Sequence, residues 1–198
     1  MDTKLIVSAS PHVRSDETTQ SLMANVIVAL CPCVVASAII FGARALLVTA
    51  VSVVACVAFE WLYCKLLKKA NPISDLSAVV TGILLSFVCP VDLPWWVIII
   101  GAFFSIVVVK QLYGGIGCNF LNPALAGRAA LVASYAGTMS GAWADPQAGW
   151  VPLAGTADVV TAATPLAYMK TGDMAGLTSQ YSVTDMFLGN IGGSLGEI

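Results

Sequence analysis

The first two thirds of the chain consist of apolar runs separated by short polar segments. Residues 22–42 carry no charge, and residues 45–64 carry only Glu60. Each run reaches the roughly 20 residues that a helix needs to cross a membrane. The pattern therefore predicts two membrane-spanning helices, one before Arg44 and one after it.

Three further apolar runs follow, at residues 76–91, 93–109 and 123–139. The first of them is short: at 1.5 Å per residue it reaches roughly 24 Å, less than a typical hydrocarbon core. The second begins with Trp95 and Trp96, and paired Trp suits a membrane–water interface. We therefore expect about five spanning helices, with the 76–91 segment either spanning or broken and re-entrant.

The remaining segments differ from this core. Residues 140–182 are rich in Gly, Pro, Thr, Ala and Asp and contain no spanning run, which predicts a long extramembrane loop. Residues 1–20 form a polar leader without the layout of a cleavable signal peptide. The expected organisation is a leader (1–20), a transmembrane domain (21–139), the loop (140–182) and the start of a further membrane helix (183–198).

Composition excludes an ordinary soluble domain. Hydrophobic residues make up 58% of the 198 residues and charged residues only 10%, whereas about a quarter of a soluble domain is charged. The net charge of −2 gives no reason to expect nucleic acid as a partner. The fold class that we expect is an all-α, polytopic membrane protein.

The basic residues predict an orientation. If the five runs alternate across the membrane, most basic residues fall on the side of the N-terminus, and the positive-inside rule places that side in the cytoplasm. The loop 140–182 then lies outside. This holds for an odd number of crossings before residue 140, and a single re-entrant run would reverse it. The residues counted inside are Lys4, Arg14, Lys65, Lys68, Lys69 and Lys110, those outside are Arg44 and Lys170, and Arg128 is not assigned.

Two charged residues lie inside apolar runs. An acid within a span is a functional candidate by default, but Glu60 lies only about 7 Å along its helix from Lys65. We therefore prefer a position near the headgroups, paired with a cytoplasmic lysine. Arg128 follows a loop and precedes an uncharged run, so we expect it to be buried and paired.

Six cysteines are spread over the chain, and none forms a Cys-x-x-Cys pair. Cys31-Pro-Cys33 is too tightly spaced for a zinc or iron–sulfur site. A structural role is expected for them, because Cys in apolar surroundings behaves as a small hydrophobe.

The segment Asp158–Leu166 predicts a short helix. Pro165 disfavours the α region for Thr164 and itself suits the first helical position, and Gly172 can end the helix. Thr164 is thus expected to be the N-cap of a helix over about 165–171. A phosphate beside Thr164 would meet free backbone N–H groups, although an ordinary Thr cap is the more common explanation of this pattern.

A second segment, residues 113–128, combines glycines with Asn119 and the Asn122-Pro123 dipeptide. Irregular backbone at membrane depth requires cover by protein or a water-filled cavity. Together with the short 76–91 run, it resembles the broken helices of transporters. A tight interfacial loop with capping asparagines explains the pattern equally well.

Three motifs occur together and in order: Ser10-Pro-His-Val-Arg14, the Asn119–Arg128 stretch and the Asp158–Leu166 stretch. In this combination the chain resembles the D subunit of the Rnf complex, the ion-translocating ferredoxin:NAD oxidoreductase. That protein is homologous to the B subunit of the sodium-pumping NADH:quinone reductase. The resemblance covers essentially the whole chain.

This resemblance implies a covalent cofactor. Members of the family carry flavin mononucleotide (FMN), joined through its phosphate to the final threonine of an Asp-x-x-Ser/Thr-Gly/Ala-Ala-Thr motif. It identifies Thr164 as the acceptor on the outer side of the membrane, and a second, non-covalent flavin (riboflavin or FMN) is implied near Asn119 and Asn122. The other motif positions implied to surround the covalent flavin are Asp158, Thr161, Ala163 and Pro165.

The implied function is that of an electron-transfer subunit in a redox-driven ion pump of the prokaryotic inner membrane, not catalytic alone. Its implied partners are the other membrane and peripheral Rnf subunits, a flavin transferase for maturation, and membrane lipid, with no nucleic acid. Family members have several more spans after the motif, so their C-terminal helices are expected to be absent here. The alternatives are a solute channel or transporter built on broken helices without flavin, and a purely structural membrane subunit.

Overall fold

The computed structural model describes residues 17–69, 73–140, 143–144, 164–189 and 191–196. Its two longest helices are α1 (Thr19–Phe41) and α2 (Ala43–Leu66), and they are joined at Gly42. The φ angle of Gly42 is 79°, a conformation that glycine adopts readily and other residues rarely do. Both helices are long and apolar enough to cross a membrane, which confirms the first two predicted helices.

The next helices are shorter than the apolar runs that predicted them. Helix α3 is Ser77–Phe87 and α5 is Pro123–Ser134, with 11 and 12 residues. At 1.5 Å per residue each measures roughly 16–18 Å, about half of a hydrocarbon core. The helical conformation is interrupted at Tyr135, before the five-residue helix α6 (Ala136–Ser140). The count of five complete spans therefore stays a prediction.

Helix α4 (Trp95–Phe103) continues directly into a π-helical segment, Phe104–Gln111. A π-helix carries hydrogen bonds from residue i to i+5, and such segments are often found at functional sites. Here the segment ends on Lys110 and Gln111, whose side chains are buried. The apolar run 93–109 predicted the helix but not this change in its winding.

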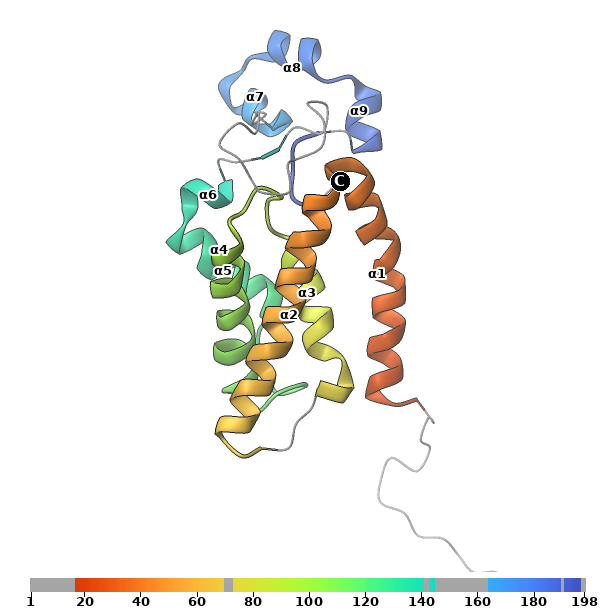
Figure 1. Ribbon diagram of the computed structural model, residues 1–198. Helices are drawn as coiled ribbons and strands as arrows, with labels where there is room; N and C mark the ends of the chain where they lie inside the picture. The colour runs from red at the N-terminus through yellow and green to blue at the C-terminus, as the bar shows by residue number, and fades with distance from the viewer. Residues whose placement is uncertain (1–16, 70–72, 141–142, 145–163, 190, 197–198) are drawn as a thin grey trace, which may run out of the picture.

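Helices α2 and α3 lie side by side (Figure 1), and their backbones approach each other closely at Gly82. A Cβ atom at Gly82 of α3 would lie 2.6 Å from the Cα atom of Val53. The hydroxyl of Ser52 donates a hydrogen bond to the carbonyl oxygen of Gly82 at 2.7 Å. Glycine at this position thus allows the short helix α3 to dock on the long helix α2.

The ends of α3 are held by neighbouring segments. At its C-terminal end, the backbone N–H groups of Leu195 and Gly196 donate to the carbonyls of Cys89 and Phe87. Nearby, the Arg44 guanidinium donates to the carbonyls of Val91 and Leu93. The bond to Phe87 satisfies a carbonyl group that the end of α3 leaves unpaired, and the others fix the loop that follows the helix.

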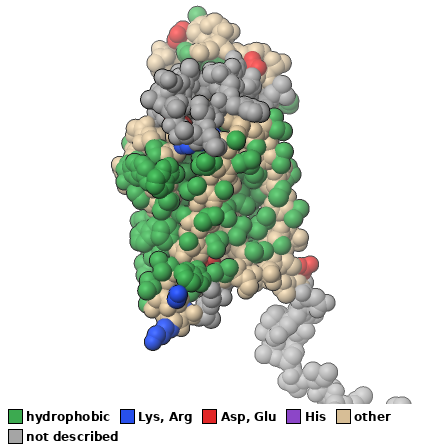
Figure 2. Space-filling view, viewed as in Figure 1, with side chains coloured by type: hydrophobic (Ala, Val, Ile, Leu, Met, Phe, Trp, Pro, Cys, Tyr) green, Lys and Arg blue, Asp and Glu red, His purple; other side chains and the backbone are tan. Residues whose placement is uncertain are grey.

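Three short helices lie at the end of the bundle where α1 meets α2 (Figure 1). The C-terminal end of α2, with its lysines, lies at the opposite end of the bundle. Figure 2 shows many hydrophobic side chains on the visible face of the bundle between these ends, where few charged ones appear. The three helices are α7 (Pro165–Thr171), α8 (Met174–Gln180) and α9 (Val183–Leu188).

None of these three helices is long enough to cross a membrane. Helices α7 and α8 have seven residues each, as expected for a segment without a spanning run. Helix α9 has six residues and ends at Gly189, whose φ angle is 78°. The membrane character predicted for residues 183–198 therefore stays a prediction.

Candidate functional site

The predicted helix after Thr164 is confirmed. Thr164 is the N-cap of α7, with φ −62° and ψ 152°, and Gly172 ends the helix with φ 75°. The carbonyl of Thr164 accepts a hydrogen bond from the N–H of Ala167 at 2.8 Å. The Thr164 side chain, however, makes no capping hydrogen bond. An ordinary Thr cap therefore does not account for this hydroxyl group.

Thr164 lies in the wall of a cavity of about 630 Å³. The cavity lies between α7, the α5–α6 region and the C-terminal segment, and its wall combines apolar side chains with a few polar ones. Pockets that bind drug-sized ligands and cofactors have volumes of about 300–1,000 Å³ and this kind of lining. Its described lining residues are Arg128, Ser140, Trp143, Thr164, Pro165, Leu166, Met169, Lys170, Ile191, Gly192 and Gly193.

The charged groups of this cavity are cationic. Its described lining includes the guanidinium of Arg128 and the ammonium of Lys170, and no Asp or Glu. Ser140 and Thr164 add hydroxyl groups, while Trp143 adds an aromatic ring. Among the described residues, this arrangement fits a ligand with an anionic group and a flat apolar part, and a flavin nucleotide has both.

The other residues of the threonine motif lie only partly within the described structure. Pro165 begins α7 and lines the cavity next to Thr164. Asp158, Thr161 and Ala163 lie outside the described residues. Their expected roles around a flavin stay predictions.

Arg128 differs from its prediction. It is half-buried on α5, and it forms no hydrogen bond or ion pair with any residue that the structure describes. The uncharged run around it suggested a buried, paired side chain. The described part of the chain supplies no partner for it, so the pair stays a prediction, and the side chain lines the cavity.

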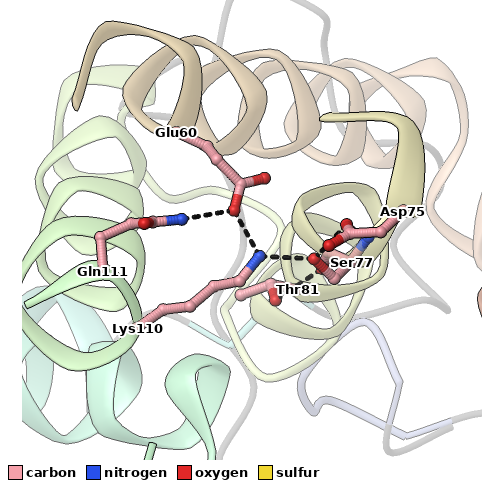
Figure 3. Close-up of polar contacts among 6 residues, drawn as sticks. All are labelled: Glu60, Asp75, Ser77, Thr81, Lys110 and Gln111. Carbon is pink, nitrogen blue, oxygen red and sulfur yellow. Dashed lines mark hydrogen bonds and ion pairs between the residues drawn. The ribbon is translucent and has the colours of Figure 1, made fainter. Parts of the chain in front are cut away.

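Glu60 belongs to a buried polar cluster near the other end of the bundle (Figure 3). Its Oε1 atom accepts hydrogen bonds from the ammonium of Lys110 at 2.6 Å and from the amide of Gln111 at 2.7 Å. The side chains of Glu60 and Lys110 are 0% and 3% exposed. The expected lysine partner is therefore present, and it is Lys110 at the end of the π-helical segment, one of the lysines counted on the cytoplasmic side. The position near the headgroups stays a prediction.

The cluster continues onto α3 (Figure 3). The Lys110 ammonium donates to the Ser77 hydroxyl at 2.6 Å, and that hydroxyl donates to the Asp75 carboxylate. Asp75 also accepts from the backbone N–H of Ser77, the first residue of α3, at 2.9 Å. Leu76, in a left-handed conformation, occupies the N-cap position itself. One cluster thus joins α2, α3 and the π-helical segment.

Asn119 and Asn122 both line a smaller cavity of about 240 Å³, together with Lys110, Ser77 and Thr81. Each asparagine also has a local structural role. The Asn122 oxygen accepts from the N–H of Ala124 at the start of α5, and the Asn119 amide donates to the carbonyl of Leu121. The interpretation as a loop with a capping asparagine is confirmed for Asn122, and both residues also line this cavity, whose wall combines polar and apolar side chains.

All six cysteines lie in the described part of the chain and are free. Cys56, Cys64 and Cys89 are buried, whereas Cys31, Cys33 and Cys118 are exposed. The structural role expected of them is consistent with burial for the first three.

The chain matches the model of the NQR2, RnfD, RnfE family over residues 6–198. It is 45% identical over 98% of its length to the D subunit of the Na⁺-translocating ferredoxin:NAD⁺ oxidoreductase complex of Acetobacterium woodii. It is 38% identical over 96% of its length to the D subunit of the proton-translocating ferredoxin:NAD⁺ oxidoreductase complex of Clostridium ljungdahlii. It is also 36% identical over 96% of its length to the D subunit of an ion-translocating oxidoreductase complex of Shewanella amazonensis.

The two long apolar helices, in a bundle whose described elements are all helices, indicate a helical membrane protein. The family match shows which one: the chain belongs to the NQR2, RnfD, RnfE family. It covers 58%, 57% and 60% of the lengths of the three relatives, so it spans about three fifths of the proteins that it matches.

Proposed function

We propose that the chain is the electron-transfer subunit that carries FMN, joined through its phosphate to Thr164, in an ion-translocating ferredoxin:NAD⁺ oxidoreductase complex. The names of its relatives support the complex, because each is the D subunit of an ion-translocating oxidoreductase. The observation that carries the flavin is the Thr164 hydroxyl: it makes no cap bond, and it lines a cationic cavity of about 630 Å³.

In this proposal the protein holds and orients the cofactor. The flavin would supply the one- and two-electron redox chemistry. Thr164 would fix the flavin through its phosphoester, and Leu166, Met169 and Trp143 would provide apolar and aromatic contact and exclude water. The cations of the cavity would neutralise the phosphate charge. The other membrane and peripheral subunits would deliver and remove electrons, and a flavin transferase would form the ester.

Mass spectrometry of the peptide that contains Thr164 tests the proposal. In protein made together with its flavin transferase, we expect the mass of one FMN phosphoester on Thr164 and in-gel flavin fluorescence. Thr164→Val should abolish both and leave membrane insertion intact. Thr171→Val is the matched control, because Thr171 lies on the same helix but uses its hydroxyl for the carbonyls of Ala167 and Tyr168. An unmodified Thr164 in wild-type protein would refute the proposal.

We also propose a second, non-covalent flavin (riboflavin or FMN) near Asn119 and Asn122. The cavity that these residues share with Lys110 supports it. Two flavins per chain, of which denaturation releases one, is the expected stoichiometry in the intact complex. A single, covalently held flavin would contradict this part.

A solute channel or transporter is the second candidate, and the half-length helices α3 and α5 favour it. It predicts solute flux across liposomes containing the purified subunit, without flavin. Covalent flavin on Thr164 together with an absence of flux would exclude it.

A further inference from the structure

Arg128 lies where two cavities meet. On one side it lines the cavity of about 630 Å³ that contains Thr164. On the other it lines a cavity of about 320 Å³ with Phe87 and Ser194. Arg128 thus borders both cavities, and its backbone has a fixed place in the bundle.

The fixed place follows from the residue before it. A Cβ atom at Gly127 would overlap the hydroxyl of Ser105 and would lie 3.0 Å from the carbonyl oxygen of Gly101. Helix α5 therefore packs directly on α4 and the π-helical segment at this point. Close packing of this kind leaves the helix little freedom to rotate, so Arg128 extends from a rigid surface.

The surroundings of Arg128 differ from those of the other cations within the bundle. Arg44 donates to the carbonyls of Val91 and Leu93, and Lys110 is paired with Glu60. Arg128 has no such partner among the described residues, although it is half-buried. Partial burial of a charge is unfavourable without compensation. An anion bound in the cavity would provide that compensation.

We propose that Arg128 binds the phosphate of the flavin nucleotide at Thr164, as a positioning residue. This inference rests on the proposed function, and it adds the group that recognises the phosphate. A guanidinium presents its N–H donors as a planar fork that matches phosphate oxygens in pairs. Lys170, on the same cavity wall, adds a second positive charge.

The same contact acts during attachment. The bond between Thr164 Oγ and phosphorus forms, the hydroxyl proton leaves to a base, and the bond between phosphorus and the leaving group of the activated flavin nucleotide breaks. Negative charge grows on the non-bridging phosphate oxygens in the transition state. Arg128 is placed to stabilise that charge and to hold phosphorus near Oγ.

The first experiment measures the rate of attachment. Full-length protein carrying Arg128→Gln or Arg128→Lys is incubated with the flavin transferase and its flavin donor, and the modified fraction of Thr164 is followed by mass spectrometry. We expect Arg128→Gln to be at least tenfold slower than wild type, with Arg128→Lys in between. Lys69→Gln, at the other end of the bundle, should match wild type.

The second experiment separates recognition from ester formation. In a Thr164→Val background no ester forms, and non-covalent binding of FMN and riboflavin is measured by quenching of flavin fluorescence. We expect FMN to bind at least tenfold more tightly than riboflavin, which lacks the phosphate. Adding Arg128→Gln should remove that preference while riboflavin binding stays unchanged, which shows that the protein is still folded.

The outcomes distinguish the two proposals. An absence of flavin on Thr164 in wild-type protein would refute the proposed function. A second outcome would overturn only the role of Arg128. In that outcome wild-type Thr164 carries flavin, and the Arg128→Gln variant acquires flavin at the wild-type rate and keeps the wild-type preference for FMN over riboflavin.

Discussion

Four charged side chains within the bundle have three different environments. Arg44 is held by backbone carbonyls, and Glu60 and Lys110 hold each other. Arg128 faces cavities. The first two arrangements lie within the described chain and join its helices, although the Oε2 atom of Glu60 is buried without a hydrogen-bond partner among the described residues. The third places a cation on the wall of a cavity, which is why we propose Arg128 as a binding residue.

The Glu60–Lys110 pair gives a prediction about stability. Lys110→Met alone leaves a buried carboxylate without its cation, and breaking a buried pair in this way costs about 3–5 kcal/mol. Glu60→Gln alone leaves the ammonium unpaired in the same way. The double variant should recover a large part of the loss, because no buried charge remains. Thermal unfolding in detergent measures all three, with Lys65→Gln as an exposed control, and strictly additive losses would contradict a direct pair.

Thr164 and Glu60 show what the sequence can predict about single residues. Helix α7 begins after Thr164 because of Pro165 and ends at Gly172, so local sequence rules were sufficient to predict both ends of the helix. The partner of Glu60 is 50 residues away, and no local pattern links it to Lys110. Lys110 at the end of an apolar run was the available signal. The sequence predicted a cytoplasmic lysine as the partner but could not say which one, because that depends on how the fold turns Glu60 inward.

At the level of helices, the pattern of apolar residues located the helices along the chain but did not predict where each one ends. An apolar run continues through a helix break when the loop is itself covered. The run 76–91 contains α3 and the buried residues Cys89 and Val91, and the run 123–139 contains both α5 and α6. The π-helical winding after Phe103 depends on packing and has no sequence signature of this kind.

The contact between α2 and α3 gives a prediction for Gly82. Gly82→Ala would place a methyl group 2.6 Å from the backbone of Val53, so α3 must move away from α2. Overpacking of this kind costs about 1–3 kcal/mol, and the Ser52 hydrogen bond would lengthen as well. Gly137→Ala in α6 is the matched control, because nothing lies within 4 Å of its Cβ position. Equal melting temperatures for the two variants would contradict the close approach.

For the whole molecule, the arrangement of the ends supports the orientation that we propose. The lysines at the C-terminal end of α2 and the helices α7–α9 lie at opposite ends of the bundle (Figure 1). Thr164 and the Glu60 cluster are therefore separated along the long axis of the bundle. The sequence predicted this separation from the distribution of basic residues, although the number of complete crossings stays a prediction because α3 and α5 are short.

We propose that the N-terminus is cytoplasmic and the threonine motif lies outside, and accessibility of introduced cysteines tests it. In the full-length protein without native cysteines, Lys170→Cys on α7 should react with a membrane-impermeant maleimide added to intact spheroplasts. Lys68→Cys, just after α2, should react only after the membrane is permeabilised, since the positive-inside rule keeps that lysine cluster in the cytoplasm. Labelling of both in permeabilised membranes is the control for exposure. The reverse pattern would place Thr164, and any flavin on it, on the cytoplasmic side.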